Sequence, residues 1–339
     1  MVNQIDELWQ YTQKIAKQEL KDTELLIFKT IDREKIERTI EKIEEAIKDK
    51  PIPEKMKKKL NYVNKNYPKK IEEYQAKEQL LGNRNSYSKT ETNATFMRLK
   101  EDHMQNSQLK AGYNVQISTN NQIITNYDVF PNPADTLTLP AHIDSYKLLY
   151  NQTPEVIIAD SGYGSEQNYE YLEQHKIDYY IKYNYFYQEE KGIREKKYPL
   201  SQDYLYYNEE QDYYVCPMGQ HMQNKETFRQ TNESGYEQEI TRYEALNCDG
   251  CPLKGACHKR QGNRIIEVNH RLTRCKRKAR ANLTSEEGIH YRKRRSIEVE
   301  TVFGNIKQNK NFRRFMLRGK RKVAIEFGLI AIAHNLKKK

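Results

Sequence analysis

A short apolar run that ends in a carboxylate is the feature that most restricts how this chain can fold. Residues 156–159 read VIIA, the continuous apolar pattern of a strand buried on both faces. Asp160 follows directly, and Gly162 and Gly164 allow the backbone to turn tightly beside it. Functional sites gather at the carboxyl ends of such strands. Asp160 is therefore a candidate metal ligand, or in the alternative reading the cap of a helix that begins near Ser165.

The sequence around this run predicts a mixed α/β order. Two strand-like runs on either side of a Thr-Asn-Asn turn predict a β-hairpin, and apolar periodicity predicts alternating helices and strands after it. Such an order is typical of a sheet flanked by helices. The predicted elements are strands 113–117 and 123–129, helix 135–149, strand 155–159, helix 165–175 and strand 178–183.

Residues 1–84 predict a helical hairpin that precedes this core. Ile36, Ile40, Ile43 and Ile47 repeat at 4-3-4 spacing among Glu and Lys, which indicates one apolar stripe on a charged helix. Pro51 and Pro53 end that helix, and a second helix follows over 54–81. We expect the stripe to pack in a core or against a partner.

The remainder of the chain divides into two further parts. Residues 185–280 are Tyr-rich, polar and without long periodicity, so they predict an insertion after the first part of the core, residues 85–184. Residues 281–339 predict basic helices that complete the core. A helix is expected over 284–310, and a buried helix over 323–336 because that segment is apolar.

A second candidate site residue lies in the helix predicted at 284–310. Glu300, Phe303 and Lys307 share one face of a helix, whereas Glu298 points roughly the other way. A carboxylate turned inward can bind Mg²⁺ while a lysine on the same face meets a phosphate. The alternative is an exposed glutamate that forms ion pairs along its own helix.

The cysteines form a third constellation. Cys216, Cys248, Cys251 and Cys257 have the spacing C…C-x2-C-x5-C with Pro and Gly between them, which suits a tetrahedral structural Zn²⁺. Only one C-x2-C occurs, so a site without metal stays open. Cys275 is expected to be a bystander, and His258 is a possible substitute ligand.

Charge indicates a polyanionic partner. The net charge is +11, and residues 258–339 hold 24 Lys and Arg against six Glu and no Asp. Nucleic acid is the usual partner of such a segment. No apolar run reaches the roughly 18 residues of a membrane span, and no signal peptide is evident, so we expect a cytoplasmic protein.

Taken together, these residues resemble the DDE transposases of bacterial insertion sequences. The segment 156–163 resembles the motif of the second Asp, and 297–307 (IEVETVFGNIK) resembles the motif of the Glu. One branch of that family carries an insertion between the two acids with a cysteine knuckle, which is matched here by Cys-Pro-Leu-Lys at 251–254. Residues 112–117 and the tail at 309–314, 318–319 and 333–336 also resemble that branch.

The resemblance implies an RNase H-like core in which three carboxylates hold two Mg²⁺ (or Mn²⁺) ions for cleavage and transfer of DNA strands. Carried over by position, Asp160 is the second acid and Glu300 the third. The basic residues expected to contact DNA are Lys307, Arg294, Arg295, Arg313 and Arg314. A related pattern, Tyr-x2-Arg-x3-Glu-x6-Lys, is split between Glu298 and Glu300, so Glu298 stays a lesser candidate.

The chain also departs from that family. Relatives carry the first acid in an Asp-Gly-Thr-like strand before the helical hairpin, and no such stretch occurs here. We therefore expect an N-terminally truncated copy that lacks the first catalytic Asp. Asp102, Asp128 and Asp135 remain near the predicted hairpin, and Asp135 could support the site from a second layer, but none occupies the position of the first acid.

These features predict a transposase-like protein that binds DNA through its C-terminal basic helices and cuts DNA poorly or not at all. The alternative is a non-catalytic DNA-binding or interaction remnant, and self-association or association with an intact transposase is expected in either case. A metal-dependent nuclease unrelated to transposition fits the acids but not the breadth of the resemblance.

Overall fold

The structure is a computed structural model that describes Leu8, Arg38 and residues 40–45, 53–82, 84–98, 108–232 and 234–338. The chain divides into two compact units, Met1–Asn83 and Arg84–Lys339. Ile36, Ile47, Pro51 and Asp102, which figure in the sequence predictions, lie outside the described residues.

The first unit contains the long helix α3 (Glu54–Leu81), which begins after Pro53 and ends at Gly82, where φ is 54°. Its core joins Val63, Tyr67 and Ile71 to Ile43 and Leu8, all of them buried. Helix 54–81 is thus confirmed to the residue, and the part of the isoleucine stripe that is described packs against it.

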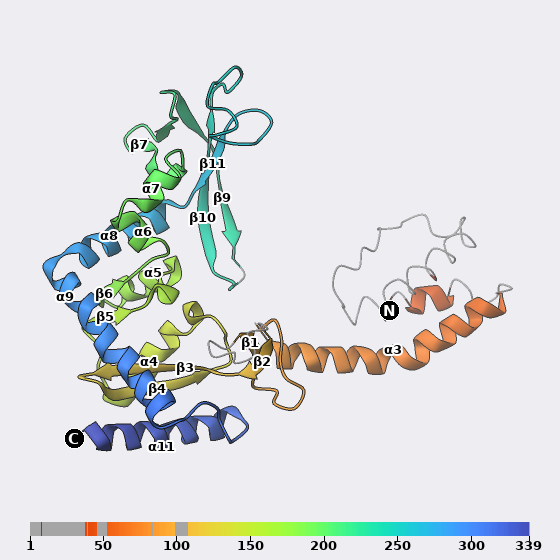
Figure 1. Cartoon of the computed structure of the whole chain (residues 1–339). Coiled ribbons are helices and arrows are strands. Elements are labelled where there is room, and N and C mark those ends of the chain that lie inside the picture. Colours follow the sequence, from red (N-terminus) through yellow and green to blue (C-terminus); the bar gives the residue numbers. More distant parts are fainter. Residues whose placement is uncertain are drawn as a thin grey trace. The chain divides into compact units, whose positions relative to one another are not determined.

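The second unit begins with two antiparallel pairs (Figure 1). β1 (Thr95–Arg98) pairs with β2 (Leu109–Gly112), and β3 (Asn114–Asn120) pairs with β4 (Ile123–Phe130). Asn121 and Gln122 both have positive φ, the backbone of a tight two-residue hairpin turn. The predicted hairpin is confirmed, with its turn one residue later than expected.

The region around Asp160 is a βαβ unit. β5 (Val156–Ala159) lies parallel to β6 (Asp178–Ile181), and α5 (Glu166–Gln174) connects them. Before it, the short turn η1 (Asp135–Leu137) leads into α4 (Leu139–Tyr150). The α/β prediction is confirmed at this level. Among the described residues, however, the two strand pairs β3–β4 and β5–β6 share no hydrogen-bonded edge, so the single sheet expected from the sequence is not formed.

Residues 186–268 form short helices and a separate antiparallel sheet, which the sequence did not predict. Three short helical segments, α6 (Phe186–Glu190), α7 (Ile193–Lys197) and η3 (Gln202–Tyr204), lead into an antiparallel sheet of order β11-β10-β9-β8-β7. Its core is small and aromatic and includes Tyr214, Met222, Tyr243 and Ile266. The strands are β7 (Tyr206–Asn208), β8 (Tyr213–Val215), β9 (His221–Thr231), β10 (Glu237–Ala245) and β11 (Ile265–Val268).

The C-terminal helices pack over both strand pairs. α8 (His270–Thr284) buries Cys275, Ala279 and Leu283 in the core around β6. α9 (Glu286–Arg295) contacts β5 and β6, and the helical segment that continues it reaches β3. In Figure 1 this segment passes from one strand pair to the other. It therefore links Asp160 to the β3–β4 hairpin.

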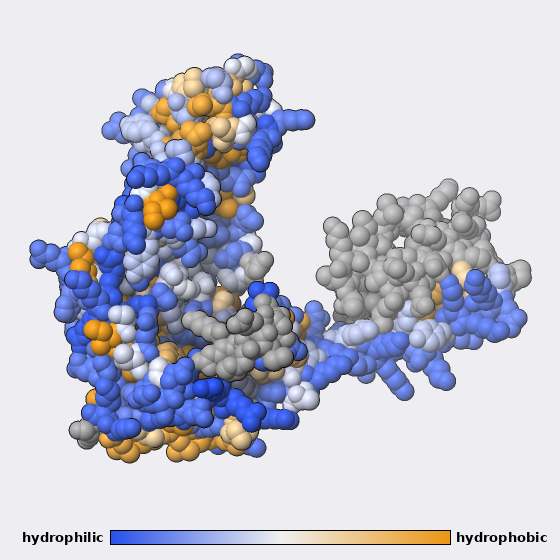
Figure 2. All heavy atoms as spheres, viewed as in Figure 1, coloured by the Kyte–Doolittle hydropathy of each residue, from blue (hydrophilic) through white to orange (hydrophobic). Residues whose placement is uncertain are grey.

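The last helix, α11 (Lys320–Lys338), covers the β3–β4 hairpin. Phe327 and Ala331 are buried there in one cluster with Ile124 and Val302. The opposite face carries exposed Ile325, Leu329, Ile332 and Leu336, and Figure 2 shows hydrophobic residues along the edge where Figure 1 places α11. The helix predicted over 323–336 is confirmed, but the expectation that it is buried holds for one face only, because only that face meets the hairpin. None of the described helices has the length and apolar composition that a membrane span requires.

Candidate functional site

Asp160 lies at the carboxyl end of β5, as its sequence context predicted. Its carboxylate accepts a hydrogen bond of 2.8 Å from the backbone N–H of Ser161 and so caps the turn at 161–163. Ser165, not Asp160, caps α5. At Gly164 a Cβ would lie 2.3 Å from the backbone oxygen of Lys182, so only glycine fits the close approach to β6. The cap occupies one side of the Asp160 carboxylate, and the side chain stays 54% exposed.

Arg295, the last residue of α9, brings Asp160 and Glu300 together. Its Nη2 atom lies 3.5 Å from Oδ1 of Asp160 and 3.2 Å from Oε1 of Glu300. The arginine side chain is only 15% exposed, whereas that of Glu300 is 63% exposed. One anchored cation thus bridges two carboxylates that face solvent. The two acids that the sequence singled out, 140 residues apart in the chain, share one site.

A π-helical turn at Ser296–Glu300 makes this pairing possible. Residues five apart differ by about 140° around a regular α-helix, so an α-helical Glu300 would point away from Arg295. A π-turn brings residue i+5 back over residue i, and such turns are frequent at functional sites. The helix predicted over 284–310 is therefore continuous but irregular, with α10 (Thr301–Gly304) and a second π-turn at Asn305–Asn309. Lys307 still lies beside Phe303, with Nζ 5.7 Å from the ring centroid.

Glu298 has a different environment from Glu300. Its Oε1 accepts a hydrogen bond of 2.9 Å from Arg294, and its Oε2 accepts one of 2.6 Å from the backbone N–H of Gln122. Arg294 also donates to the side chain of Asn121. Both carboxylate oxygens of Glu298 are thus engaged at the turn of the β3–β4 hairpin, and Glu298 and Arg294 fasten that turn to the helix. The geometry separates the two glutamates that the motif left ambiguous.

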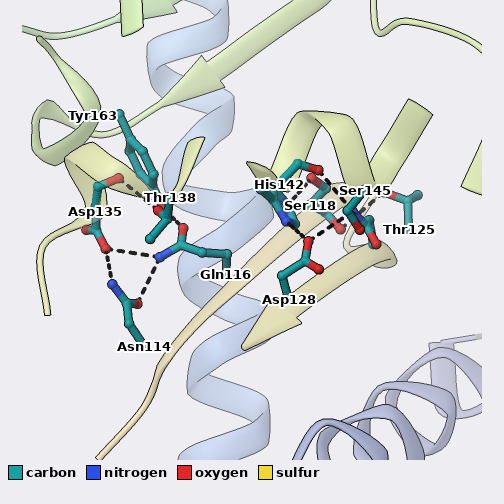
Figure 3. Close-up of polar contacts among 11 residues, drawn as sticks. Asn114, Gln116, Ser118, Thr125, Asp128, Asp135, Thr138, His142, Ser145 and Tyr163 are labelled. Atoms are coloured by element: carbon teal, nitrogen blue, oxygen red, sulfur yellow. Dashed lines mark hydrogen bonds and ion pairs between the residues drawn. The ribbon is translucent and has the colours of Figure 1, made fainter. Parts of the chain in front are cut away.

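A network of amides lies next to Asp160 (Figure 3). Asn114 and Gln116 donate to Oδ1 of Asp135 at 2.7 and 3.0 Å, and Tyr163 is hydrogen-bonded to Gln116. Burial, followed by the charge of Asp135, raises the pKa of the Tyr163 phenol, which therefore stays protonated. This network holds the turn after Asp160 against β3. Sequence reasoning had flagged only Asp135; the alternation of polar residues at 114 and 116 was the signal it missed.

The face of the hairpin toward α4 carries a second polar chain. His142 on α4 bonds through Nδ1 to Asp128, at 2.5 Å, and through Nε2 to Ser118, at 2.8 Å (Figure 3). Asp128, one of the remaining acids, thus pairs with a buried histidine and does not face Asp160. This chain fixes α4 on the hairpin.

The four predicted zinc ligands line one cavity. Cys216, Cys248, Cys251 and Cys257 surround it together with His258. Burial raises the pKa of the Cys257 thiol, an effect that the nearby Arg264 guanidinium opposes. Cys275 lies elsewhere, in the core of α8, where burial raises its thiol pKa to about 11.

Two observations bear on a metal in this cavity. Both ring nitrogens of His258 are buried without a hydrogen-bond partner among the described residues, and burial lowers the pKa of the ring. A neutral, unpaired imidazole beside thiols is the donor set that Zn²⁺ prefers. Within the part of the chain that the structure describes, however, no group of three or more His, Cys, Asp or Glu side chains is arranged to hold a metal ion.

The basic segment between Lys307 and Lys322 contains no acidic residue. Phe312 and Phe315 pack against the core and against each other edge to face, so Arg313 and Arg314 between them are exposed to solvent. Glu326 on α11 accepts hydrogen bonds from the backbone N–H groups of Met316 and Leu317, which follow Phe315 in the chain. No acidic residue occurs from 301 to 325. Cations that the fold holds in place without neutralising them suit the phosphates of DNA.

Comparison with known families agrees with these motifs. Residues 215–339 match the family model described as "Transposase DDE domain". This part of the chain is therefore similar to a transposase DDE domain, which supports the resemblance stated from the motifs within residues 215–339. The matched range contains Glu300 and the cysteines but not Asp160. Neither a curated protein nor a solved structure matches the chain.

Proposed function

We propose that this chain is a transposase-like DNA-binding protein that supplies two acids, Asp160 and Glu300, to a Mg²⁺-dependent (or Mn²⁺-dependent) strand-cleavage site and that cuts DNA poorly by itself. The observation that carries this proposal is the shared guanidinium of Arg295, which joins the two acids on the surface of the unit. The fold is proposed to be an RNase H-like core with an insertion that contains β7–β11.

The donor set fits a hard divalent cation. Mg²⁺ is usually bound by one or two carboxylates and keeps several waters or substrate phosphates as its other ligands. Asp160 and Glu300 are more than half exposed, which leaves room for those ligands. When bound, two such ions activate water or a DNA 3′-OH and stabilise both the attacking and leaving oxygens.

Weak cleavage follows from the number of acids. The described residues bring only these two carboxylates to the guanidinium of Arg295. Asp135, which lies next to the turn after Asp160, already accepts hydrogen bonds from two side-chain amides. A site with two of three carboxylates binds the second ion poorly. The same observation favours a non-catalytic DNA-binding remnant as the second candidate, because Arg295 already forms an ion pair with each of the two acids.

DNA would be held by the exposed cations of the segment 307–322. Lys307, Arg313 and Arg314 were predicted contacts, and each is exposed without an ion pair among the described residues. Arg294 and Arg295 were predicted contacts as well, but each is paired with acids. We therefore assign the main contribution to DNA binding to the segment 307–322.

Two further parts of the proposal concern zinc and assembly. The cysteine cavity with His258 is proposed to hold a structural Zn²⁺, on the strength of its thiols and the unpaired imidazole. The exposed apolar face of α11 supports self-association or association with an intact transposase, because contiguous exposed apolar surface marks interaction sites.

The proposed function is tested by binding to linear and supercoiled DNA across a salt series. Steeply salt-dependent binding without Mg²⁺ is expected, together with little or no strand cleavage when Mg²⁺ or Mn²⁺ is added. Binding that does not change with salt would contradict the proposal.

A further inference from the structure

The guanidinium of Arg295 occupies the position that a cation between Asp160 and Glu300 would take. One nitrogen atom lies within 3.5 Å of an oxygen from each carboxylate. A divalent cation bound by both acids would lie between the same two carboxylates, next to the positive charge of this guanidinium. Arg295 cannot give up its charge, because arginine stays protonated in proteins. The two cations therefore compete for one pair of carboxylates.

The ion pair between Arg294 and Glu298 differs from the contacts of Arg295 because both of its members have further hydrogen-bond partners. Arg294 and Glu298 are held from both ends, since Glu298 also accepts from the backbone of Gln122 and Arg294 also donates to Asn121. Asp160 has one other partner, the N–H of Ser161, and Glu300 is 63% exposed. A metal ion can thus replace the contacts of Arg295 to these two acids without breaking other contacts of the fold.

We propose that Arg295 is an internal counter-ion that closes the cation site of Asp160 and Glu300 and must leave both carboxylates before a divalent cation binds there. This inference rests on the proposed function, and it adds a positioning residue that controls metal entry. Once displaced, the guanidinium remains beside the site at the end of α9, where a phosphate of DNA is its natural new partner. Arg295 therefore makes metal binding and DNA binding favour each other.

The test measures Mn²⁺ binding to the full chain without DNA, by electron paramagnetic resonance of free Mn²⁺. Arg295→Met removes the charge but keeps the aliphatic stem of this mostly buried side chain. The expected result is binding about tenfold tighter than in the unaltered chain, because a competing positive charge has been removed. Arg295→Lys, which keeps the charge, is expected to bind as weakly as the unaltered chain.

Arg294→Met is the matched control, because it removes the adjacent arginine whose partner is Glu298. It is expected to leave Mn²⁺ affinity unchanged, whereas Asp160→Asn or Glu300→Gln added to Arg295→Met should abolish the gain. The inference is overturned if Arg295→Met binds Mn²⁺ no tighter than the unaltered chain, if Arg294→Met gives the same gain, or if the gain survives loss of either acid. Salt-dependent DNA binding by the unaltered chain is measured in the same series. If the Mn²⁺ results overturn the inference while salt-dependent DNA binding is observed, the role of Arg295 is rejected and the proposed function is retained.

Discussion

Replacing the unpaired cations of the segment 307–318 is expected to weaken DNA binding much more than replacing paired ones. The variant carries four substitutions to glutamine, at Lys307, Arg313, Arg314 and Arg318. All four side chains are exposed, and the segment 301–325 contains no acid that could neutralise them. Each phosphate contact contributes about 0.9 to the slope of log K against log salt. Loss of four contacts therefore reduces the steepness of that slope by up to about 3.6. The affinity that the variant loses between 50 and 200 mM salt is then smaller, by roughly two orders of magnitude, than the affinity that the unaltered chain loses.

The matched control replaces the same number of charges on α8. Arg271, Arg274, Lys278 and Arg280 lie 3.0 to 3.9 Å from glutamates of the same unit, so their charge is already partly balanced. We expect a clearly smaller change of slope for this variant. The assay is fluorescence anisotropy with a labelled duplex over a salt series. Equal changes for both variants would refute the reasoning, because net charge alone would then explain binding.

Three further outcomes are expected. Glu298→Ala should lower the free energy of unfolding by about 1 kcal/mol in urea titrations, since it removes the partly buried hydrogen bonds to Arg294 and to the backbone of Gln122. Exposed Glu300→Ala should change it by less than about 0.5 kcal/mol, and the reverse order would contradict the assignment of the two glutamates. Metal analysis of the purified chain should find zinc that is lost in Cys251→Ser and kept in Cys275→Ser, and zinc retained by the first variant would exclude the cysteine cavity. Asp212, in the turn between β7 and β8, accepts hydrogen bonds from Tyr243, Asn224 and Tyr207. Burial raises its pKa, but these hydrogen bonds outweigh burial and lower the pKa, so its contribution to stability, present above about pH 4, should be lost as pH falls, and Asp212→Asn should flatten that acid limb of the stability curve.

Local signals predicted the elements that have clear ends. Helix α3 is bounded by Pro53 and Gly82, and both were visible in the sequence as helix-ending residues. The apolar run before Asp160 identified β5, because no other short segment is aliphatic throughout and followed by two glycines. The acids at 160 and 300 were chosen from a family resemblance and helix geometry, and the structure places both at Arg295.

Three features were not predictable from local pattern. Strand β9 has both faces exposed over most of its length, so it lacks the alternation that identifies a half-buried strand. The π-turn at 296–300 has no signature in composition, yet it decides which glutamate faces Asp160. The bridging role of Arg295 depends on two segments that meet only in the folded chain.

The most direct test of the central claim is a cleavage assay with purified chain on supercoiled DNA in Mg²⁺ and in Mn²⁺. The account predicts DNA binding with little or no nicking, and any residual nicking is expected to fall further in Asp160→Ala. Robust cleavage that is abolished by Asp160→Ala and by Glu300→Ala would contradict it, because two acids held by Arg295 would then suffice for the chemistry.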